Sequence, residues 1–209
     1  MSEQSKELLY IADPMCSWCW GFAPVITAVR KKYADTLDIS LTLGGLRPGT
    51  TEPLAENLKQ QVLHHWHEVH KATGQPFCFD FSLPEGFCYD TEPSCRAAVC
   101  VRELAPDQTF DYFDALHHAF YAENRDLTDT DILADLAEAH GIDRNEFLKL
   151  FESKEAQLKT HNDFARAQSF GMQGFPAAIL QDDRGPALLT VGYQPFEEIE
   201  GRIDAWLAD

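Results

Sequence analysis

The sequence predicts an α/β fold in which a β–α–β segment and a β–β–α segment enclose a long helical block. Residues 8–12 form a continuous apolar run that an Asp-Pro pair ends, which is typical of a buried parallel strand. From residue 17 to residue 33, apolar side chains recur every three or four positions, which predicts a helix that Pro24 kinks. Residues 37–43 then alternate between apolar and polar side chains, the pattern of a second strand.

Helical signals fill the middle of the chain. Two apolar stripes with helical spacing are Leu54, Leu58, Val62 and Trp66, and Phe110, Phe113, Leu116 and Phe120. Another helix is predicted over residues 91–105, and a capping box at residues 128–131 predicts a helix start there. Asp143 and Ser153 are predicted to cap two further helices, the second of which ends near Gly171.

Strand signals return near the C-terminus. Residues 177–180 and 188–191 are short apolar runs, and the link at residues 181–186 has the composition of a hairpin turn. A last apolar stripe over residues 199–207 predicts a closing helix. We find no internal repeat and no linker, so we expect one domain that carries a large insertion.

The composition argues against two classes of partner. The chain has 34 acidic and 17 basic residues and a net charge of −17, and such a surface repels nucleic acid. No segment approaches the ~18 apolar residues that a membrane span needs. Residues 1–7 lack the basic and apolar regions of a signal peptide, so we expect a cytoplasmic protein with no membrane partner.

The motif Cys16-Ser17-Trp18-Cys19 lies where the first strand meets the first helix. Unpaired amides and the helix dipole at a helix N-terminus favour a thiolate. Side chains three positions apart on the first turn face the same way, so the two sulfurs can reach bonding distance. We therefore predict that Cys16 is an exposed nucleophile and that Cys19, one turn further on, is a shielded resolving thiol.

A Cys-x-x-Cys pair also occurs in zinc sites, which need a second pair of ligands. The other cysteines, Cys78, Cys88, Cys95 and Cys100, have no such spacing, so redox chemistry is favoured. Cys78 and Cys88 could form an accessory disulfide, but two buried thiols are expected in a reducing compartment. Cys95 and Cys100 are expected to pack as small apolar residues.

Residues 13–22 (DPMCSWCWGF) resemble the active-site segment of the DsbA-like family, nearest to a branch described as predicted protein-disulfide isomerases. The resemblance implies a thioredoxin-like domain over residues 1–45 and 172–209, with a helical insertion over residues 46–171. Gly174-Phe175-Pro176 matches the position at which these proteins carry a cis-proline. The resemblance therefore implies that the Phe175–Pro176 bond is cis and faces the two sulfurs.

The resemblance also implies a reaction, namely dithiol–disulfide exchange through a mixed disulfide on Cys16 that Cys19 resolves. Phe175 and Pro176 would bind an extended substrate, and Trp18 would border its groove. No cofactor is expected, although glutathione is considered as a co-substrate, and glutathione or a thioredoxin system would recycle the enzyme. The partners would be disulfide-containing proteins or small thiols. The oxidant DsbA proteins carry a histidine between their cysteines that this sequence lacks, which favours a reductase or isomerase role.

Two alternatives stay open. One is a glutathione-dependent isomerase or transferase of the kappa-class or 2-hydroxychromene-2-carboxylate isomerase type, which shares the fold but activates glutathione with a serine. The presence of both Cys16 and Cys19 argues against it. The other is a zinc- or partner-binding module. The histidines at positions 64, 65, 67 and 70 could share a metal, but a solvated helix face is the favoured interpretation.

Overall fold

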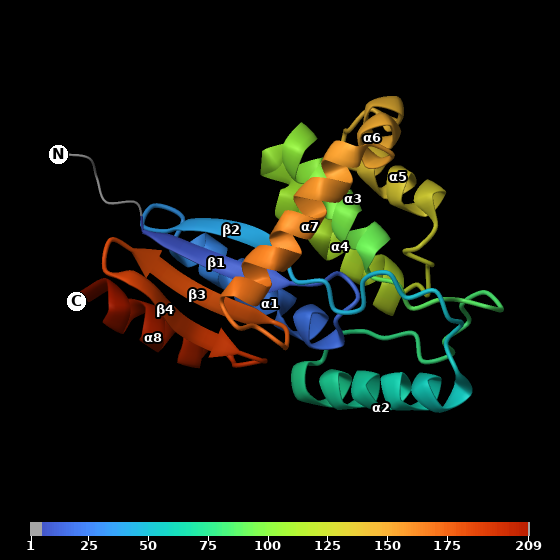
Figure 1. The fold of residues 1–209 in the computed structure, drawn as a ribbon. Coiled ribbons are helices and arrows are strands. Elements are labelled where there is room, and N and C mark those ends of the chain that lie inside the picture. Colours follow the sequence, from blue (N-terminus) through green and yellow to red (C-terminus); the bar gives the residue numbers. More distant parts are fainter. Residues whose placement is uncertain (1–5, 209) are drawn as a thin grey trace.

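The computed structural model describes residues 6–208 and builds them around one mixed four-stranded sheet (Figure 1). Its strands are β1 (Glu7–Ala12), β2 (Asp38–Leu43), β3 (Ala177–Asp182) and β4 (Gly185–Val191). Their order is β2-β1-β3-β4, in which β1 pairs parallel to β2 and antiparallel to β3. The predicted β–α–β and β–β–α segments thus meet in the middle of the sheet, which confirms the thioredoxin-like α/β fold.

The helices follow the predicted order. They are α1 (Ser17–Lys32), α2 (Glu56–Thr73), α3 (Glu92–Leu104), α4 (Thr109–Tyr121), α5 (Thr130–Ala139), α6 (Arg144–Phe151), α7 (Lys154–Ser169) and α8 (Phe196–Ala208), with a short 3-10 turn at Pro106–Gln108. Asp143 and Ser153 cap α6 and α7 as predicted, since their side chains accept hydrogen bonds from backbone amides of the first turn. None of the helices in residues 6–208 is long and apolar enough to cross a membrane.

Three local predictions were wrong. Leu54 precedes α2 instead of belonging to it. The helix predicted from a capping box at Thr128 is capped by Asp129, whose side chain accepts from the Asp131 amide. The hairpin link is shorter than residues 181–186, because pairing of β3 with β4 continues to Asp182 and Gly185. The Asp129 cap and the pairing of β3 with β4 set two of these boundaries, and Leu54 is held outside α2 by a backbone hydrogen bond from its amide to the Phe87 carbonyl at 2.8 Å.

The two faces of the sheet bury different layers. Leu8, Tyr10 and Ala12 of β1 belong to the main core with α1, and Leu9 and Ile11 face the opposite side. There they pack with Ala167 of α7 and with Ala177 and Ile179 of β3. This alternation is the two-residue period of a strand buried on both faces.

The division between a thioredoxin-like part and an insertion at residues 46–171 stays a prediction. Helices α3 to α6 lie to one side of the sheet, whereas α7 runs from them across it (Figure 1). The N-terminal residues 1–5, which contributed to the expected absence of a signal peptide, lie outside the described part of the chain.

Candidate active site

Cys16 begins the first helix. Its amide donates to the Asp13 carbonyl at 3.1 Å, and its own carbonyl accepts from the amides of Cys19 at 2.9 Å and Trp20 at 3.1 Å. The residue therefore occupies the N-cap of α1, where it has extended backbone angles. At this end of a helix the free amides and the dipole stabilise negative charge, so the position suits a thiolate.

The two motif thiols differ in burial less than predicted. Cys19 is fully buried, but Cys16 is also only 6% exposed, so the expectation of an exposed Cys16 was wrong. Residues of distant segments cover it, among them Phe175, whose carbonyl accepts a hydrogen bond from Cys16 Sγ at 3.4 Å. Both residues are free thiols, and burial together with the neighbouring Cys16 raises the pKa of Cys19 well above its usual value.

Asp13 anchors the loop that precedes Cys16. Its fully buried carboxylate accepts hydrogen bonds from the amides of Met15 at 2.8 Å and Leu46 at 2.7 Å, and from Cys95 Sγ at 3.4 Å. Burial raises the pKa of Asp13, and the two amide hydrogen bonds oppose this. The carboxylate thus ties the active-site loop to the loop after β2. Cys95, which was expected to pack only as an apolar residue, also makes a hydrogen bond.

The Phe175–Pro176 peptide bond is cis, as predicted. The Phe175 side chain packs so closely on Gly44 that a Cβ at Gly44 would lie 2.2 Å from the ring. Glycine is therefore required at this position, directly after β2, because only a residue without a side chain leaves room for the Phe175 ring over the end of the strand. This packing places the Phe175 carbonyl beside Cys16.

A cavity of about 410 Å³ opens beside Cys16. Five parts of the chain form its wall, namely residues 15–18, residues 46–47, the α2 residues Val62, His65 and Trp66, Tyr89, and residues 174–175. Most of these groups are apolar, and Arg47 supplies a cation. A cleft of this size and composition is typical of a binding site for a small molecule or a peptide segment.

Trp18 lies between this cavity and a second hollow. It is half-buried, lines both, and its ring lies 6.0 Å from that of Tyr193. Its neighbours Trp20 and Phe22 are buried, so Phe22 is a core residue as expected. The placement of Trp18 suits a groove residue, and its role in substrate binding stays a prediction.

The other four cysteines lie outside the motif, although Cys95 reaches the Asp13 carboxylate beside it. Cys95 and Cys100 are buried and free, as expected. Cys78 and Cys88 are also free thiols, but they are half-buried, so the expectation that both are buried was wrong. Each lies in the irregular segment between α2 and α3, where Cys78 Sγ accepts from the Asn124 amide at 3.1 Å.

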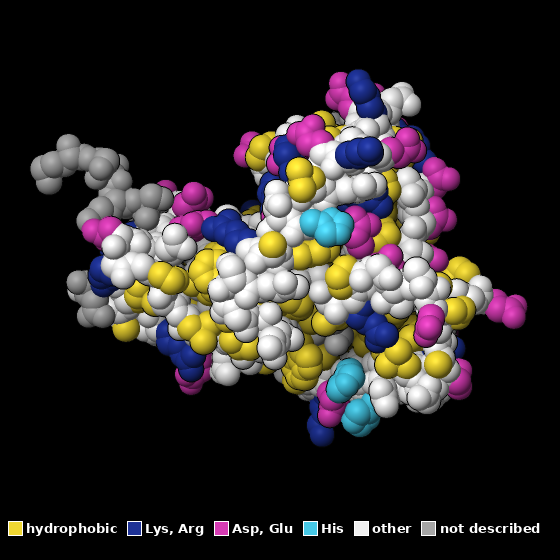
Figure 2. Space-filling model, viewed as in Figure 1, with side chains coloured by type: hydrophobic (Ala, Val, Ile, Leu, Met, Phe, Trp, Pro, Cys, Tyr) yellow, Lys and Arg dark blue, Asp and Glu magenta, His cyan; other side chains and the backbone are white. Residues whose placement is uncertain are grey.

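The histidines of α2 form an exposed helix face, as predicted. His64 and His65 lie 3.5 and 3.2 Å from Glu68, and the His67 ring stacks on Phe79 at 4.1 Å. Histidine side chains are visible on the surface in the region of α2 (Figure 2). Within residues 6–208, no group of three or more His, Cys, Asp or Glu side chains has the geometry of a metal site.

Several residues of the site were missed by sequence reasoning. Asp13 was interpreted only as the end of a strand, and Tyr10 only as part of an apolar run. Tyr89, whose hydroxyl donates to the Met15 carbonyl at 2.7 Å, lies in a segment without a pattern. Arg47 follows the Gly44-Gly45 pair and carried no signal. Only Asp13 had a usable signal, since a charged residue between an apolar run and a Cys-x-x-Cys motif has to find partners when it is buried.

Comparison with known proteins agrees with this geometry. A family model described as a DSBA-like thioredoxin domain matches residues 9–204, which is nearly the whole chain. This chain belongs to the DsbA-like thioredoxin family. The family assignment confirms the resemblance carried by residues 13–22 and by Gly174-Phe175-Pro176.

Solved structures with the DsbA-like fold include close matches. A candidate protein disulfide isomerase from Nitrosomonas europaea is 44% identical, covers 98% of each chain and has a TM-score of 0.92. The cytosolic disulfide reductase DsbM from Pseudomonas aeruginosa is 23% identical, with 97% of this chain and 98% of that chain covered and a TM-score of 0.80. At that identity the second match shows the fold alone.

Curated relatives carry a different description. The ClpXP adapter protein SpxH of Halalkalibacterium halodurans is 21% identical over 197 residues, which are 91% of this chain and 64% of that protein. SpxH of Bacillus subtilis is 23% identical over 203 residues, which are 92% of this chain and 66% of that protein. The chain therefore spans just under two thirds of the length of these relatives.

Proposed function

We propose that this chain is a thiol–disulfide oxidoreductase in which Cys16 is the nucleophile and Cys19 the resolving thiol. The observation that carries the proposal is the position of Cys16, which caps α1, lines the 410 Å³ cavity and contacts the Phe175 carbonyl. Cys19 lies one turn further on and is fully buried. A substrate sulfur in the cavity therefore meets Cys16 first.

The exchange has two steps. The Cys16 thiolate attacks a substrate disulfide, forms a mixed disulfide and releases one substrate thiolate, which takes up a proton. Cys19 then loses its proton and attacks Cys16 Sγ, so that the Cys16–Cys19 disulfide forms and the second substrate thiol leaves. The substrate gains two electrons, and the oxidised enzyme regains them from two molecules of glutathione or from a dithiol of the thioredoxin type.

We infer that the direction is reduction or isomerisation of protein or small-molecule disulfides. Ser17 and Trp18 separate the cysteines, so the imidazolium that stabilises the thiolate of oxidant DsbA proteins is missing. His117 packs near Trp20, with ring centroids 5.9 Å apart, but burial lowers the pKa of His117 to about 3 and keeps the ring neutral. A less stabilised thiolate makes the disulfide a weaker oxidant.

Two features support the expected partners and location. The cavity has room for a tripeptide-sized thiol, and one solved structure of DsbM is described as DsbM with GSH. Arg47 would attract the carboxylates of such a ligand. A cytosolic site of action fits a reducing exchange protein, and DsbM is described as cytosolic. Phe175 and Pro176 would align an extended substrate, as in strand addition.

Cysteine variants test the mechanism. Cys16→Ser should abolish reduction of insulin disulfides, because no nucleophile reaches the substrate. Cys19→Ser should form mixed disulfides that persist and can be isolated under non-reducing conditions. Cys100→Ser, at a buried position outside the site, is the matched control and should retain activity. Full activity of Cys16→Ser would refute the mechanism.

The direction is tested by a redox titration. Against glutathione, the Cys16–Cys19 couple should lie below the ~−120 mV of DsbA, in the range of about −180 to −270 mV found for isomerases and thioredoxin. A value near that of DsbA would refute the reductase or isomerase role and would leave the thiol mechanism intact.

The alternatives make different predictions. A glutathione transferase or isomerase would use Ser17 and would form glutathione conjugates when both cysteines are replaced. An adapter, the description of the SpxH relatives, would bind its partner equally well with or without Cys16 and Cys19. A zinc module would contain stoichiometric metal after purification. Loss of insulin reduction in Cys16→Ser would argue against all three as the main activity.

A further inference from the structure

Tyr10 lies at the centre of the molecule, directly beneath the motif cysteines. It occupies the middle of β1, where its backbone pairs with Leu41 on one side and Ala178 on the other. The side chain is fully buried on the α1 face of the sheet. Its ring stacks on Phe22 at 5.8 Å and meets Phe113 edge-on at 6.3 Å. Apolar packing therefore fixes the direction of the hydroxyl.

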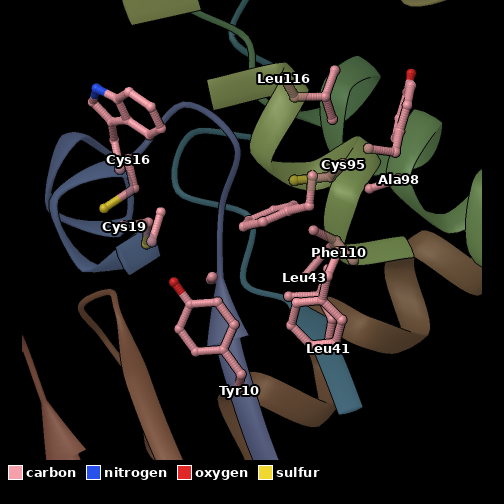
Figure 3. Close-up of a cluster of buried hydrophobic side chains, with 14 of the residues drawn as sticks. Tyr10, Cys16, Cys19, Leu41, Leu43, Cys95, Ala98, Phe110 and Leu116 are labelled. Atoms are coloured by element: carbon pink, nitrogen blue, oxygen red, sulfur yellow. The ribbon is translucent and has the colours of Figure 1, made fainter. Parts of the chain in front are cut away.

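The Tyr10 hydroxyl has no hydrogen-bond partner, although it is sealed from solvent. An unpaired hydroxyl in such a place destabilises a fold, and buried hydroxyls nearly always find a partner. Figure 3 shows that this hydroxyl is directed toward Cys19. The pKa of Tyr10 is raised mainly by burial, and further by the neighbouring Cys19 and Cys16. The hydroxyl therefore keeps its proton, and toward a neighbouring anion it acts as a hydrogen-bond donor.

Cys19 needs such a donor at one moment of the proposed cycle. To attack the mixed disulfide it must become a thiolate at a fully buried position, where burial and the neighbouring Cys16 disfavour its charge, while a backbone hydrogen bond at Asp13 offsets part of this. A preorganised neutral donor stabilises a developing anion in such a site. In the dithiol state this hydroxyl lies close to Cys19 but makes no hydrogen bond of normal geometry.

We propose that Tyr10 donates a hydrogen bond to the Cys19 thiolate while that thiolate attacks Cys16. This inference rests on the proposed function. In the step, the bond between Cys19 Sγ and Cys16 Sγ forms, and the bond between Cys16 Sγ and the substrate sulfur breaks. The proton of Cys19 ends on the departing substrate thiol, and Tyr10 keeps its own proton throughout. The residue thus accelerates resolution and has no part in the first attack.

A chromogenic aromatic disulfide separates the two steps, because each step releases one coloured thiol. The experiment uses the reduced full chain with Cys78→Ser and Cys88→Ser, which removes the half-buried thiols that would also react. Stopped-flow absorbance then shows a first release caused by Cys16 and a second release caused by Cys19. In Tyr10→Phe the first phase should be unchanged and the second slower by about tenfold, the effect of one hydrogen bond to a charged group.

Tyr112→Phe is the matched control. Tyr112 is also fully buried, but its hydroxyl donates to the carbonyl of Leu133 in α5 at 3.0 Å. Its loss should lower the free energy of unfolding and change neither phase. Tyr10→Phe should leave the dithiol form at least as stable as the wild type, because it removes a hydroxyl that has no partner there.

The outcomes are separable. An unchanged second phase in Tyr10→Phe would overturn the role of Tyr10 and leave the proposed function standing. An equal slowing of both phases would also overturn it, since a general loss of packing would act on both. If the wild type released no second thiol, the proposed function itself would fail, and the inference with it.

Discussion

Burial decides the charge of individual side chains around the motif. The pKa of Cys19 is raised and that of His117 is lowered to about 3, both mainly because the charged form would be cut off from water. At neutral pH the site therefore contains a neutral imidazole and a protonated Cys19 thiol. The helix N-terminus at Cys16 is then the main source of positive potential for a thiolate, apart from Arg47 at the cavity wall.

Asp114 gives a pH-dependent prediction at the residue scale. It lies on α4 toward α1, and burial raises its pKa to about 7, while Arg30 opposes the shift. Because the folded-state pKa exceeds the unfolded one, the contribution of Asp114 to stability is complete below about pH 4 and is lost as the pH rises to about 7. Asp114→Asn should remove this pH-dependent loss of stability. At neutral pH the free energy of unfolding of the variant should exceed that of the wild type by on the order of 1–2 kcal/mol, a figure that allows for the partial exposure of Asp114.

Urea unfolding of both proteins at about pH 5 and about pH 8 measures the effect. Asp107→Asn, at an exposed position just before α4, gives the baseline for the loss of one negative charge. Parallel pH dependence of the wild type and Asp114→Asn would contradict the prediction.

At the scale of elements, one helix depends on its neighbour. Pro24 lies inside α1 and has no N–H, so the Trp20 carbonyl lacks its usual partner in the helix. Gln75, just after α2, donates to this carbonyl at 2.8 Å, and the Trp20 indole donates to the Pro76 carbonyl at 3.0 Å. The end of α2 thus replaces the missing bond and holds α2 beside the first turns of α1.

The end of β2 gives a prediction at the element scale. Gly44→Ala would place a methyl group against the Phe175 ring, so that the ring and its carbonyl have to move away from Cys16. We expect the free energy of unfolding to fall by about 1–3 kcal/mol, the usual cost of overpacking, and insulin reduction to slow. Chemical denaturation and the insulin assay measure the two effects.

Gly201→Ala is the matched control for this change. A Cβ at Gly201 would meet no atom within 4 Å, and the residue lies inside α8. The substitution should raise stability by about 0.5–1 kcal/mol through helix propensity and leave activity unchanged. Wild-type behaviour of Gly44→Ala in both assays would contradict the close packing of Phe175.

At the scale of the whole molecule, an ion pair within the helical block also makes hydrogen bonds to the sheet. Arg102 of α3 forms a bidentate ion pair with Asp163 of α7, in which the two guanidinium nitrogens donate to the two carboxylate oxygens at 2.8 and 3.1 Å. Both residues also form hydrogen bonds with the backbone of β2. Arg102 donates to the Leu41 carbonyl at 2.8 Å, and Asp163 accepts from the Leu43 amide at 3.0 Å. The pair therefore connects two helices and the edge strand whose end supports Phe175.

Removing one partner should reveal this connection. Arg102→Met leaves Asp163, whose side chain is 13% exposed, without its cation, and we expect the free energy of unfolding to fall by about 2–4 kcal/mol. Lys159→Met is the control, because its pairs with Glu103 and Glu155 are more exposed and should contribute less than about 1 kcal/mol. Thermal and urea unfolding of both variants provide the comparison, and equal losses would contradict the structural role of the Arg102–Asp163 pair.

The sequence by itself determined the parts of this protein that depend on neighbours along the chain. Apolar periodicity located β1, α1 and β2, and the short-range caps Asp143 and Ser153 set helix starts. The Cys-x-x-Cys motif at a strand-to-helix junction indicated the candidate site, since its spacing puts both sulfurs on one turn. The family resemblance of Gly174-Phe175-Pro176 then indicated the cis bond opposite them.

The tertiary structure alone decided what surrounds the sulfurs. Asp13 binds Leu46 and Cys95, 33 and 82 positions away, and the Phe175 carbonyl reaches Cys16 from 159 positions away. These contacts bury Cys16 and shape the cavity beside it. No local pattern encodes them, because a pattern reports which face of an element is apolar and not which distant group packs against it. Desolvation depends on all of these groups together, so the chemistry of the thiols is a property of the assembled fold.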